Sequence, residues 1–343
     1  MRKCGGARYS RAVAVTLKDV ARRAGVSPRT VSNVVNGHGP IAPATRSRVE
    51  DAITDLGYRP NVLARTLRTG RTGIIALAIP ELDVPYFAEL ARFVVEEAEA
   101  LGYRVMLEQT DGRVAREREQ LRSGPAPLFD GLIFSPISLH GSDIHRLAAR
   151  SPVVLLGERS DDGLCDHVMI DNVGAARDAT AHLIASGRRR VAAIGDQPHV
   201  TARMRTAGYS AALADAGIAF DPELLVGARR FHRADGATAM RGLLAGGEPP
   251  DAVFCFNDLL ALGAMRVILG AGLRVPEDIA VVGFDDIEDG QYATPSLTTV
   301  APDKRFIARE AVRRLVARIA DPGLAPQEVE APYELVVRES SGG

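Results

Sequence analysis

Cysteine is scarce in this sequence, and a long apolar run is absent. The 343 residues include three cysteines, Cys4, Cys165 and Cys255, whose wide spacing supports neither a disulfide framework nor a metal site. No apolar stretch approaches the roughly 20 residues of a membrane span, and residues 1–15 lack the hydrophobic region of a secretory signal. These absences argue against small disulfide-rich, membrane-spanning and secreted proteins. We therefore expect a cytoplasmic protein that does not associate with a membrane.

Residue sets for catalysis are also missing. The seven histidines show no spacing typical of metal ligands. No G-x-G-x-x-G follows an expected strand, which disfavours a dinucleotide-dependent enzyme. The sequence thus predicts neither a cofactor nor a metal. An α/β enzyme remains an alternative, but one that lacks an acid, base or nucleophile set.

Charge is distributed unevenly along the chain, although the net charge is only −1. Residues 1–72 contain 14 basic and 4 acidic residues, whereas the remainder contains 28 basic and 39 acidic residues. A compact basic module beside an acidic body is typical of a protein that binds a polyanion through one end. A solvated charged surface would be mixed and would not explain this segregation. The length favours a small module followed by one or two α/β units.

Residues 16–36, TLKDVARRAGVSPRTVSNVVN, predict two short helices separated by a turn. The first helix has an apolar stripe with helical spacing, formed by Leu17, Val20, Ala21 and Ala24. Gly25 permits the sharp turn, and Ser27 followed by Pro28 is a typical helix start. Two helices joined in this way form the helix-turn-helix, whose second helix enters the DNA major groove. A helical hairpin without a DNA-binding role would show the same periodicity, so spacing alone leaves both interpretations open.

The segment that follows carries a family resemblance. A third helix is expected over 44–56, and then comes GYRPNVLARTLRTGRTGIIALAIP (57–80). Together with TLKDVARRAGVSPRTVSNVVNG (16–37), this segment resembles the headpiece and hinge of the lactose/galactose repressor (LacI/GalR) family. The resemblance is dense over 16–80 and continues more sparsely to about residue 339. It implies a sequence-specific DNA-binding transcriptional regulator, expected to be a repressor, whose operator affinity is set by a small effector.

The resemblance assigns base reading to the start of the second helix. Arg29 has the geometry to bind guanine bidentately, whereas Pro28 offers only apolar contact. Asn33 stands where many family members carry arginine, and asparagine favours adenine by geometry. Phosphate contacts are expected from Thr16, Ser27, Ser32, Asn36 and Thr45, and Leu17 and Tyr58 complete the expected DNA-contacting set. Ser27 and Asn36 also have a purely structural interpretation, as the cap and the end of a helix.

Residues 60–68 resemble the family's hinge. Nine residues are too few for a helix that is stable alone in water. The resemblance implies that this helix forms only on operator DNA, beside the same segment of a dimer mate. Leu67 then matches the apolar wedge that opens a base step through the minor groove, which Asn61 and Ala64 also face. An exposed linker leucine is the structural alternative.

From Gly73 onward, strand-like apolar runs alternate with amphipathic helices, which predicts an α/β body. The run GIIALAIP (73–80) is apolar throughout, as in a parallel strand covered on both faces. We expect two doubly wound parallel sheets, and such bilobed bodies resemble periplasmic sugar-binding proteins, whose chain crosses between the lobes. The helix over 303–320 and the final strand YELVVRES (333–340) are assigned to the second lobe.

These patterns divide the chain into parts. We expect a flexible basic tail over 1–15, the helix-turn-helix headpiece over 16–58, the hinge helix and linker over 59–72, and an effector-binding and dimerisation body over 73–339, with a first lobe over about 73–172 and a second over about 173–300. The tail either adds weak phosphate attraction or reflects a start codon placed too far upstream. Since no leucine heptad follows residue 339, we favour a homodimer over a tetramer.

The effector is expected in the cleft between the lobes, outside the carboxyl ends of the strands. Tyr86 and Phe87 follow the first strand and are suited to stacking on a ring. The resemblance assigns further effector contacts to Arg205, Phe231, Asn257 and Asp285, with Glu158 and Lys304 as weaker candidates. Arginine suits hydroxyls or a carboxylate. Arginine, asparagine and aspartate that converge on one cleft with aromatic rings are typical of sites for polyhydroxylated rings, so a sugar is the first expectation. Asn257 and Asp285 have an alternative interpretation as caps of helices or turns.

Three protein classes are compared for this sequence: a DNA-binding regulator, a solute-binding protein, and the α/β enzyme that lacks an acid, base or nucleophile set. A DNA-binding regulator explains both the headpiece and the body. A solute-binding protein explains the body but not the headpiece, and it would need a signal peptide. Since most members of the resembled family lose DNA when they bind effector, we expect induction.

Overall fold

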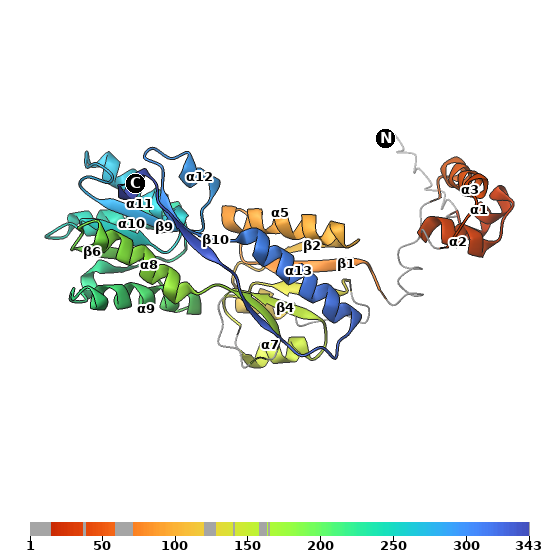
Figure 1. Ribbon diagram of the computed structural model, residues 1–343, viewed down its shortest axis with the longest axis horizontal. Coiled ribbons are helices and arrows are strands. Elements are labelled where there is room, and N and C mark those ends of the chain that lie inside the picture. The colour runs from red at the N-terminus through yellow and green to blue at the C-terminus, as the bar shows by residue number, and fades with distance from the viewer. Residues whose placement is uncertain are drawn as a thin grey trace, which may run out of the picture. The chain divides into compact units, whose positions relative to one another are not determined.

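A computed structural model describes residues 15–36, 39–58, 71–119, 128–139, 141–157, 163 and 165–342. The chain divides into two compact units, Met1–Thr72 and Gly73–Gly343 (Figure 1). The predictions for Asn61, Ala64, Leu67 and Glu158, and for the tail over 1–14, lie outside the described residues, as does the side chain of Asn36.

The headpiece consists of three helices, α1 (Leu17–Ala24), α2 (Pro28–Asn36) and α3 (Pro43–Leu56). Thr16 starts α1, since its backbone N–H and its hydroxyl both donate to the Asp19 carboxylate. Gly25 ends α1 with a φ of 66°, a conformation that glycine adopts without a steric penalty. The buried side chains form one small core: Val20, Ala21, Ala24, Val31, Val34, Val49 and Ala52.

The first sheet of the body is parallel, with the strand order β11-β5-β4-β3-β1-β2. Its strands are β1 (Ile74–Ile79), β2 (Arg104–Gln109), β3 (Gly131–Phe134), β4 (Val153–Leu156), β5 (Asp166–Met169) and β11 (Glu328–Glu330). Among the described residues, the helices of this lobe are α5 (Pro85–Ala100), α6 (Val114–Glu119), α7 (Gly141–Ala148) and α13 (Lys304–Ala320). The central strands are buried, apart from the partly exposed Ile74 at the start of β1, because helices cover both faces.

The second sheet has the order β12-β10-β9-β8-β6-β7 and is parallel except for β12. Its strands are β6 (Val191–Asp196), β7 (Leu225–Gly227), β8 (Ala252–Cys255), β9 (Ala280–Phe284), β10 (Thr298–Pro302) and β12 (Tyr333–Val336). The helices are α8 (Asn172–Ala185), α9 (Val200–Asp215), α10 (Arg233–Ala245), α11 (Asp258–Gly270) and α12 (Glu288–Gln291), with 3₁₀ turns at Pro222–Leu224 and Glu339–Ser341. Two parallel-dominant sheets therefore form the expected α/β bilobed body.

One helix assignment was wrong. Helix α13, predicted in the second lobe, packs on α5 and on β3, β4 and β5 of the first lobe. Leu315 and Ile319 of α13 lie so close to Gly131 that an added Cβ there would meet Leu315 Cδ1 at 2.7 Å. The chain crosses between the lobes near residues 170–172, 302–304 and 330–333, and β11, which was not anticipated, then completes the first sheet (Figure 1). The first sheet is thus finished by residues far along the chain.

Candidate functional site

The start of α2 is the exposed part of the headpiece where base readers were predicted. Val31 and Val34 are buried in the headpiece core, while Pro28 and Arg29 are exposed. Asn33 is partly exposed on the same helix. The first turn of α2 therefore presents an arginine that is not needed for the core, as a recognition helix requires.

Other predicted DNA contacts have structural roles in the headpiece. The Ser27 hydroxyl accepts the backbone N–H of Thr30 at 3.1 Å, so it caps α2. Leu17 and Tyr58 pack against the headpiece core. Thr16 is bonded to Asp19, and these hydrogen bonds lower the pKa of the Asp19 carboxyl. A contact to phosphate by these residues would thus add to a structural role.

A cleft of about 790 Å³ lies between the lobes of the body. It is lined by six of the predicted effector residues: Tyr86, Phe87, Arg205, Phe231, Asn257 and Asp285. Tyr86 and Phe87 come from the first turn of α5, whereas the other four come from the second lobe. The structure therefore brings together side chains that are up to 199 positions apart in the sequence.

Arg205 is fixed within the floor of the cleft. Its Nε donates to Asn172 Oδ1 at 2.7 Å, and its Nη1 donates to the Phe256 carbonyl oxygen. The guanidinium carbon lies 3.4 Å from the centre of the Phe284 ring, a cation–π arrangement. These contacts set the plane of a buried guanidinium group, whose forked donors suit oxygen atoms of a ligand.

Asp285 lies just beyond the carboxyl end of β9, in an unusual backbone conformation. Its φ is 112°, and the next residue, Asp286, has a φ of 48°. Such conformations cost non-glycine residues about 1–3 kcal/mol each and persist only when surrounding contacts enforce them. Burial raises the pKa of the Asp285 carboxyl to about 6, although the positive charges of Arg205 and Lys304 oppose this rise.

The aromatic side chains of the cleft contact one another edge to face. The ring centres of Tyr86 and Phe87 are 5.2 Å apart, and Phe231 lies 5.4 Å from the ring of His199. Asn257 Oδ1 accepts the N–H of Leu260 and so caps α11, while its Nδ2 donates to the Phe231 carbonyl at 3.1 Å. The capping interpretation of Asn257 is therefore correct, and the same amide also holds Phe231 in place.

Several polar residues that line the cleft were not anticipated, among them Glu81, Asp111 and His199. Each of these three lies shortly after a strand, namely β1, β2 and β6, so the rule that selected Tyr86 would also have selected them. His199 Nδ1 accepts the Ala202 N–H at 3.3 Å, and burial lowers the pKa of His199 to about 4. Glu81 of the first lobe contacts His232 of the second at 2.6 Å, which joins the lobes beside the cleft.

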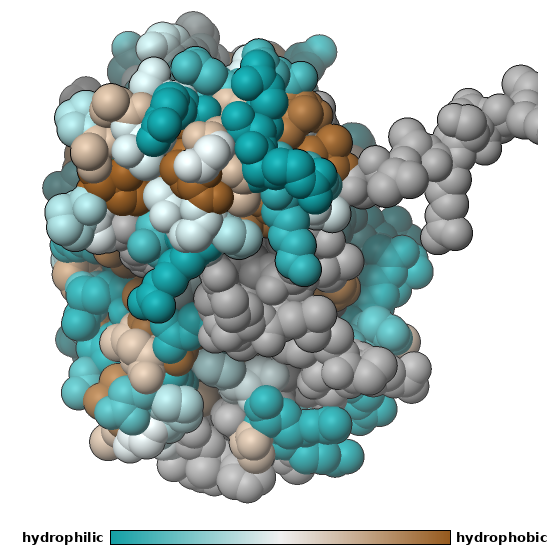
Figure 2. Space-filling view, turned by 90° about the vertical axis from the view of Figure 1, so that its right-hand side faces the viewer, coloured by the Kyte–Doolittle hydropathy of each residue, from teal (hydrophilic) through white to brown (hydrophobic). Residues whose placement is uncertain are grey.

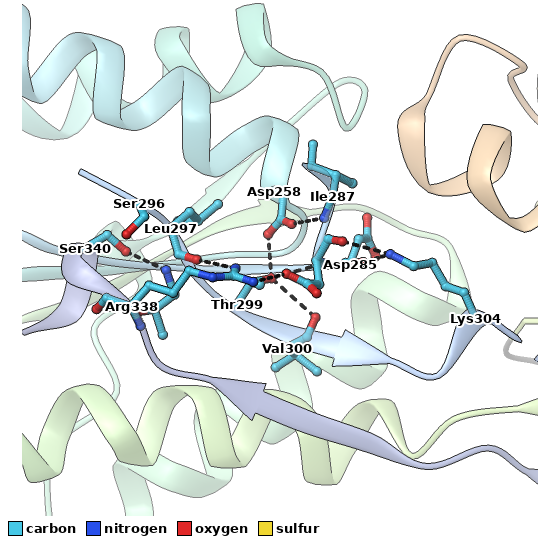
Figure 3. A network of polar contacts seen from close by, with 12 residues as sticks. Asp258, Asp285, Ile287, Ser296, Leu297, Thr299, Val300, Lys304, Arg338 and Ser340 are labelled. Atoms are coloured by element: carbon cyan, nitrogen blue, oxygen red, sulfur yellow. Dashed lines mark hydrogen bonds and ion pairs between the residues drawn. The ribbon is translucent and has the colours of Figure 1, made fainter. Parts of the chain in front are cut away.

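The prediction that Lys304 contacts the effector is wrong. Lys304 is not among the residues that line the cleft, and its side chain is only 8% exposed. Its Nζ donates to the carbonyl oxygen of Asp285 at 2.7 Å (Figure 3). The same Nζ donates to the carbonyl oxygen of Asp286 at 2.8 Å and lies 2.7 Å from Glu89 Oε2. The ammonium group therefore binds groups of the protein itself, namely the backbone at Asp285 and Asp286 and the Glu89 carboxylate.

Comparisons with known proteins match both parts of the chain. Residues 16–61 match the family of bacterial regulatory proteins, lacI family, and residues 180–341 match the periplasmic binding protein-like domain. The transcriptional regulator CelR of Thermobifida fusca is 40% identical over 337 residues, which cover 95% of this chain and 98% of CelR. The chain belongs to the LacI family.

Two solved structures of LacI-family regulators extend the comparison. A CelR–cellobiose complex is 36% identical, has a TM-score of 0.71, and covers 95% of this chain and 99% of its own. The Lac repressor dimer bound to operator and the anti-inducer ONPF is 30% identical, has a TM-score of 0.85, and covers 96% and 99%. This LacI-family chain is therefore a DNA-binding transcriptional regulator with an effector-binding body, and not an enzyme.

The described part of this LacI-family regulator contains no helix that is long and apolar enough to span a membrane. Within the same residues, no group of three or more histidine, cysteine or acidic side chains is placed to hold a metal ion. On the face drawn in Figure 2, hydrophobic residues occur as small patches among hydrophilic ones.

Proposed function

We propose that this regulator binds a near-palindromic operator as a homodimer, and that a sugar bound in the cleft weakens this binding. The observation that carries the sugar assignment is the convergence of aromatic side chains with Arg205, Asn257 and Asp285 in one cleft. Rings stack on the apolar faces of polyhydroxylated ligands, while arginine and carboxylate groups bind their hydroxyls. The cellobiose bound to the related CelR supports the same ligand class.

The proposed DNA contacts follow the headpiece. Arg29 and Asn33 read bases, Pro28 makes an apolar contact, and Thr16, Leu17, Ser27, Ser32, Asn36, Thr45 and Tyr58 position the headpiece on the duplex. In the hinge, Leu67 opens a base step through the minor groove beside Asn61 and Ala64. The exposure of Arg29 at the start of α2 supports the first of these assignments.

The proposed homodimer has support from the edge of the first sheet. Strand β2 is an edge strand, and Leu107 on it is 43% exposed. Leu101, in the turn before β2, is 51% exposed. An open strand edge with exposed leucines favours association with another chain. The related Lac repressor was solved as a dimer on its operator.

The test measures sugar binding and operator binding on the same protein. Cellobiose, glucose, lactose, nucleosides and purines are screened by thermal shift, since a ligand of the native state raises its melting temperature. Gel-shift titrations then measure operator affinity with and without cellobiose. We expect Arg205→Ala to lose the response to sugar while it keeps operator affinity near that of the unliganded protein. Arg274→Ala, which removes a 67% exposed arginine paired with Asp278, is the control.

Two results would contradict this proposal. If the purines stabilise the protein and the sugars do not, the ligand class is wrong. If Arg205→Ala responds to cellobiose at an unchanged concentration, the effector site lies elsewhere.

A further inference from the structure

The turn at Asp285 and Asp286 is held by contacts on every side (Figure 3). The Asp285 N–H donates to the Val300 carbonyl at 2.8 Å, and the Asp286 carboxylate accepts from Arg338 at 2.7 Å. The N–H of the next residue, Ile287, donates to the buried Asp258 carboxylate at 2.9 Å. Two consecutive non-glycine residues with positive φ require such enforcement, and strain of this kind concentrates at ligand sites.

Lys304 is the member of this network that comes from the other lobe. It is the first residue of α13, which packs on the first lobe, yet its Nζ donates to the carbonyl oxygens of Asp285 and Asp286 in the second lobe. Both acceptors belong to the strained turn, so a single ammonium group fixes both of its peptide planes. Without that group, the two carbonyls would lose their charged donor.

The same ammonium group is also tied to the aromatic wall of the cleft. Its ion-pair partner Glu89 lies on α5, three residues after Tyr86 and two residues after Phe87. Lys304 therefore links the backbone at Asp285 and Asp286 to α5, the helix that carries Tyr86 and Phe87.

We propose that Lys304 is a positioning residue of the effector site. Through the two carbonyls it sets the direction of the Asp285 carboxyl, and through Glu89 it fixes the distance from that carboxyl to Tyr86 and Phe87. Lys304 thus favours effectors whose hydroxyl and ring are separated by the distance from the Asp285 carboxyl to Tyr86 and Phe87. It also couples ligand binding at one lobe to the position of the other lobe. This inference rests on the proposed function in that the effector is a sugar.

The test compares Lys304→Met, Lys304→Arg and Glu89→Gln with a matched control. Arg305→Met is suitable, because Arg305 is the next residue of α13 and also pairs with α5, through Glu96 at 3.1 Å, but it does not reach the turn. Cellobiose affinity is measured by calorimetry. We expect Lys304→Met to weaken it by about tenfold or more, as for the loss of charged hydrogen bonds, and Lys304→Arg to restore most of it. Glu89→Gln should have a smaller effect, and Arg305→Met none.

A second measurement needs no ligand. Amide hydrogen exchange at Asp286 and Ile287 should accelerate in Lys304→Met but not in Arg305→Met, while exchange in β6 and β8 stays unchanged. A general loss of stability would accelerate exchange throughout the second lobe and would overturn the proposal. So would unaltered exchange at the turn, or a Lys304→Met protein that binds cellobiose as tightly as the unmodified protein. If the unmodified protein binds none of the screened sugars, the sugar assignment fails, and the exchange result alone decides the role of Lys304.

Discussion

Asp285 is a residue at which burial and charge act in opposite directions. Burial disfavours its carboxylate, while Arg205 and Lys304 favour it, and the resulting pKa is about 6. Because this pKa lies above the ordinary value of 3.8, the folded protein holds more protons at Asp285 than the unfolded chain between about pH 4 and pH 6. The contribution of Asp285 to the free energy of unfolding therefore decreases as the pH rises through that window, and the ionised group is available to ligands above it.

This titration predicts a pH-dependent affinity for the effector. If the Asp285 carboxylate accepts hydrogen bonds from a sugar, binding should weaken as the pH falls through about 6, and it should be constant from pH 7 to pH 8. His199, with a pKa of about 4, stays neutral over that range and adds no slope. Calorimetry with cellobiose from pH 5 to pH 8 measures the profile. Asp285→Asn should bind weakly and with no slope near pH 6, and a slope that persists in this variant would assign the titration to another group.

Arg29 carries a separate prediction about DNA. If it reads guanine, Arg29→Ala should weaken operator binding by about 1–3 kcal/mol and relax the preference at one base pair of each half-site. Binding to a library of operator variants gives both numbers. A loss of equal size on all sequences would instead identify a phosphate contact. Arg22→Ala, which changes an exposed arginine paired with Asp19, is a control for general loss of charge.

The distance between helices α10 and α11 depends on a glycine in each of them. Gly236 of α10 lies against the backbone of Leu260, and Gly263 of α11 lies against the backbone of Arg233. An added Cβ would come within 2.1 Å of Leu260 O in the first case and 2.0 Å of Arg233 O in the second. The two helices can therefore approach this closely only because both positions are glycine.

The close approach of α10 and α11 predicts that substitution by alanine has opposite effects on stability at Gly263, which lies in the contact, and at Gly242, which does not. We expect Gly263→Ala to lower the free energy of unfolding by about 1–3 kcal/mol, because the helices must separate to admit a methyl group. Gly242→Ala on α10 has open space around the new Cβ and should raise that free energy by about 0.5–1 kcal/mol through helix propensity. Urea unfolding followed by circular dichroism compares the two. Equal effects would show that the close approach is not limiting.

The local sequence pattern was sufficient to predict most helices and strands, but not the lobe to which each of them belongs. The strands β1 and β3 are continuous apolar runs, and the helices have amphipathic spacing, so both can be found from neighbouring residues. The lobe to which α13 belongs depends on where the chain crosses between the sheets, which no local pattern encodes. Strand β11, Glu-Val-Glu, is too short and polar to indicate burial. Likewise, Asp285 could be selected because it follows a strand, and Arg205 because it matches the resembled family. The role of Lys304 could not be predicted, because it depends on a turn whose φ angles are set by distant contacts.

At the scale of the whole molecule, the separation of charge predicts how binding responds to salt. The excess of basic residues in 1–72 should neutralise several phosphates, and each neutralised phosphate releases a counterion. For a dimer making about 6–10 such contacts, operator affinity should fall by roughly 10³–10⁵ between 50 and 200 mM salt. Cellobiose binding by the body, measured in the same buffers, should change far less. Operator binding that is indifferent to salt would contradict the proposed footprint.

The chain crossings between the lobes also bear on how the protein is made. The first lobe's strands β1 to β5 are complete by Met169, but α13 and the edge strand β11 are supplied only by residues 304–330. At bacterial translation rates, on the order of 10 seconds separate the synthesis of these parts. During that interval the nascent first lobe exposes the surface around Gly131 that Leu315 and Ile319 later cover. The first lobe can therefore bury that surface only after residues 304–330 have been synthesised, by which time most of the second lobe has already left the ribosome.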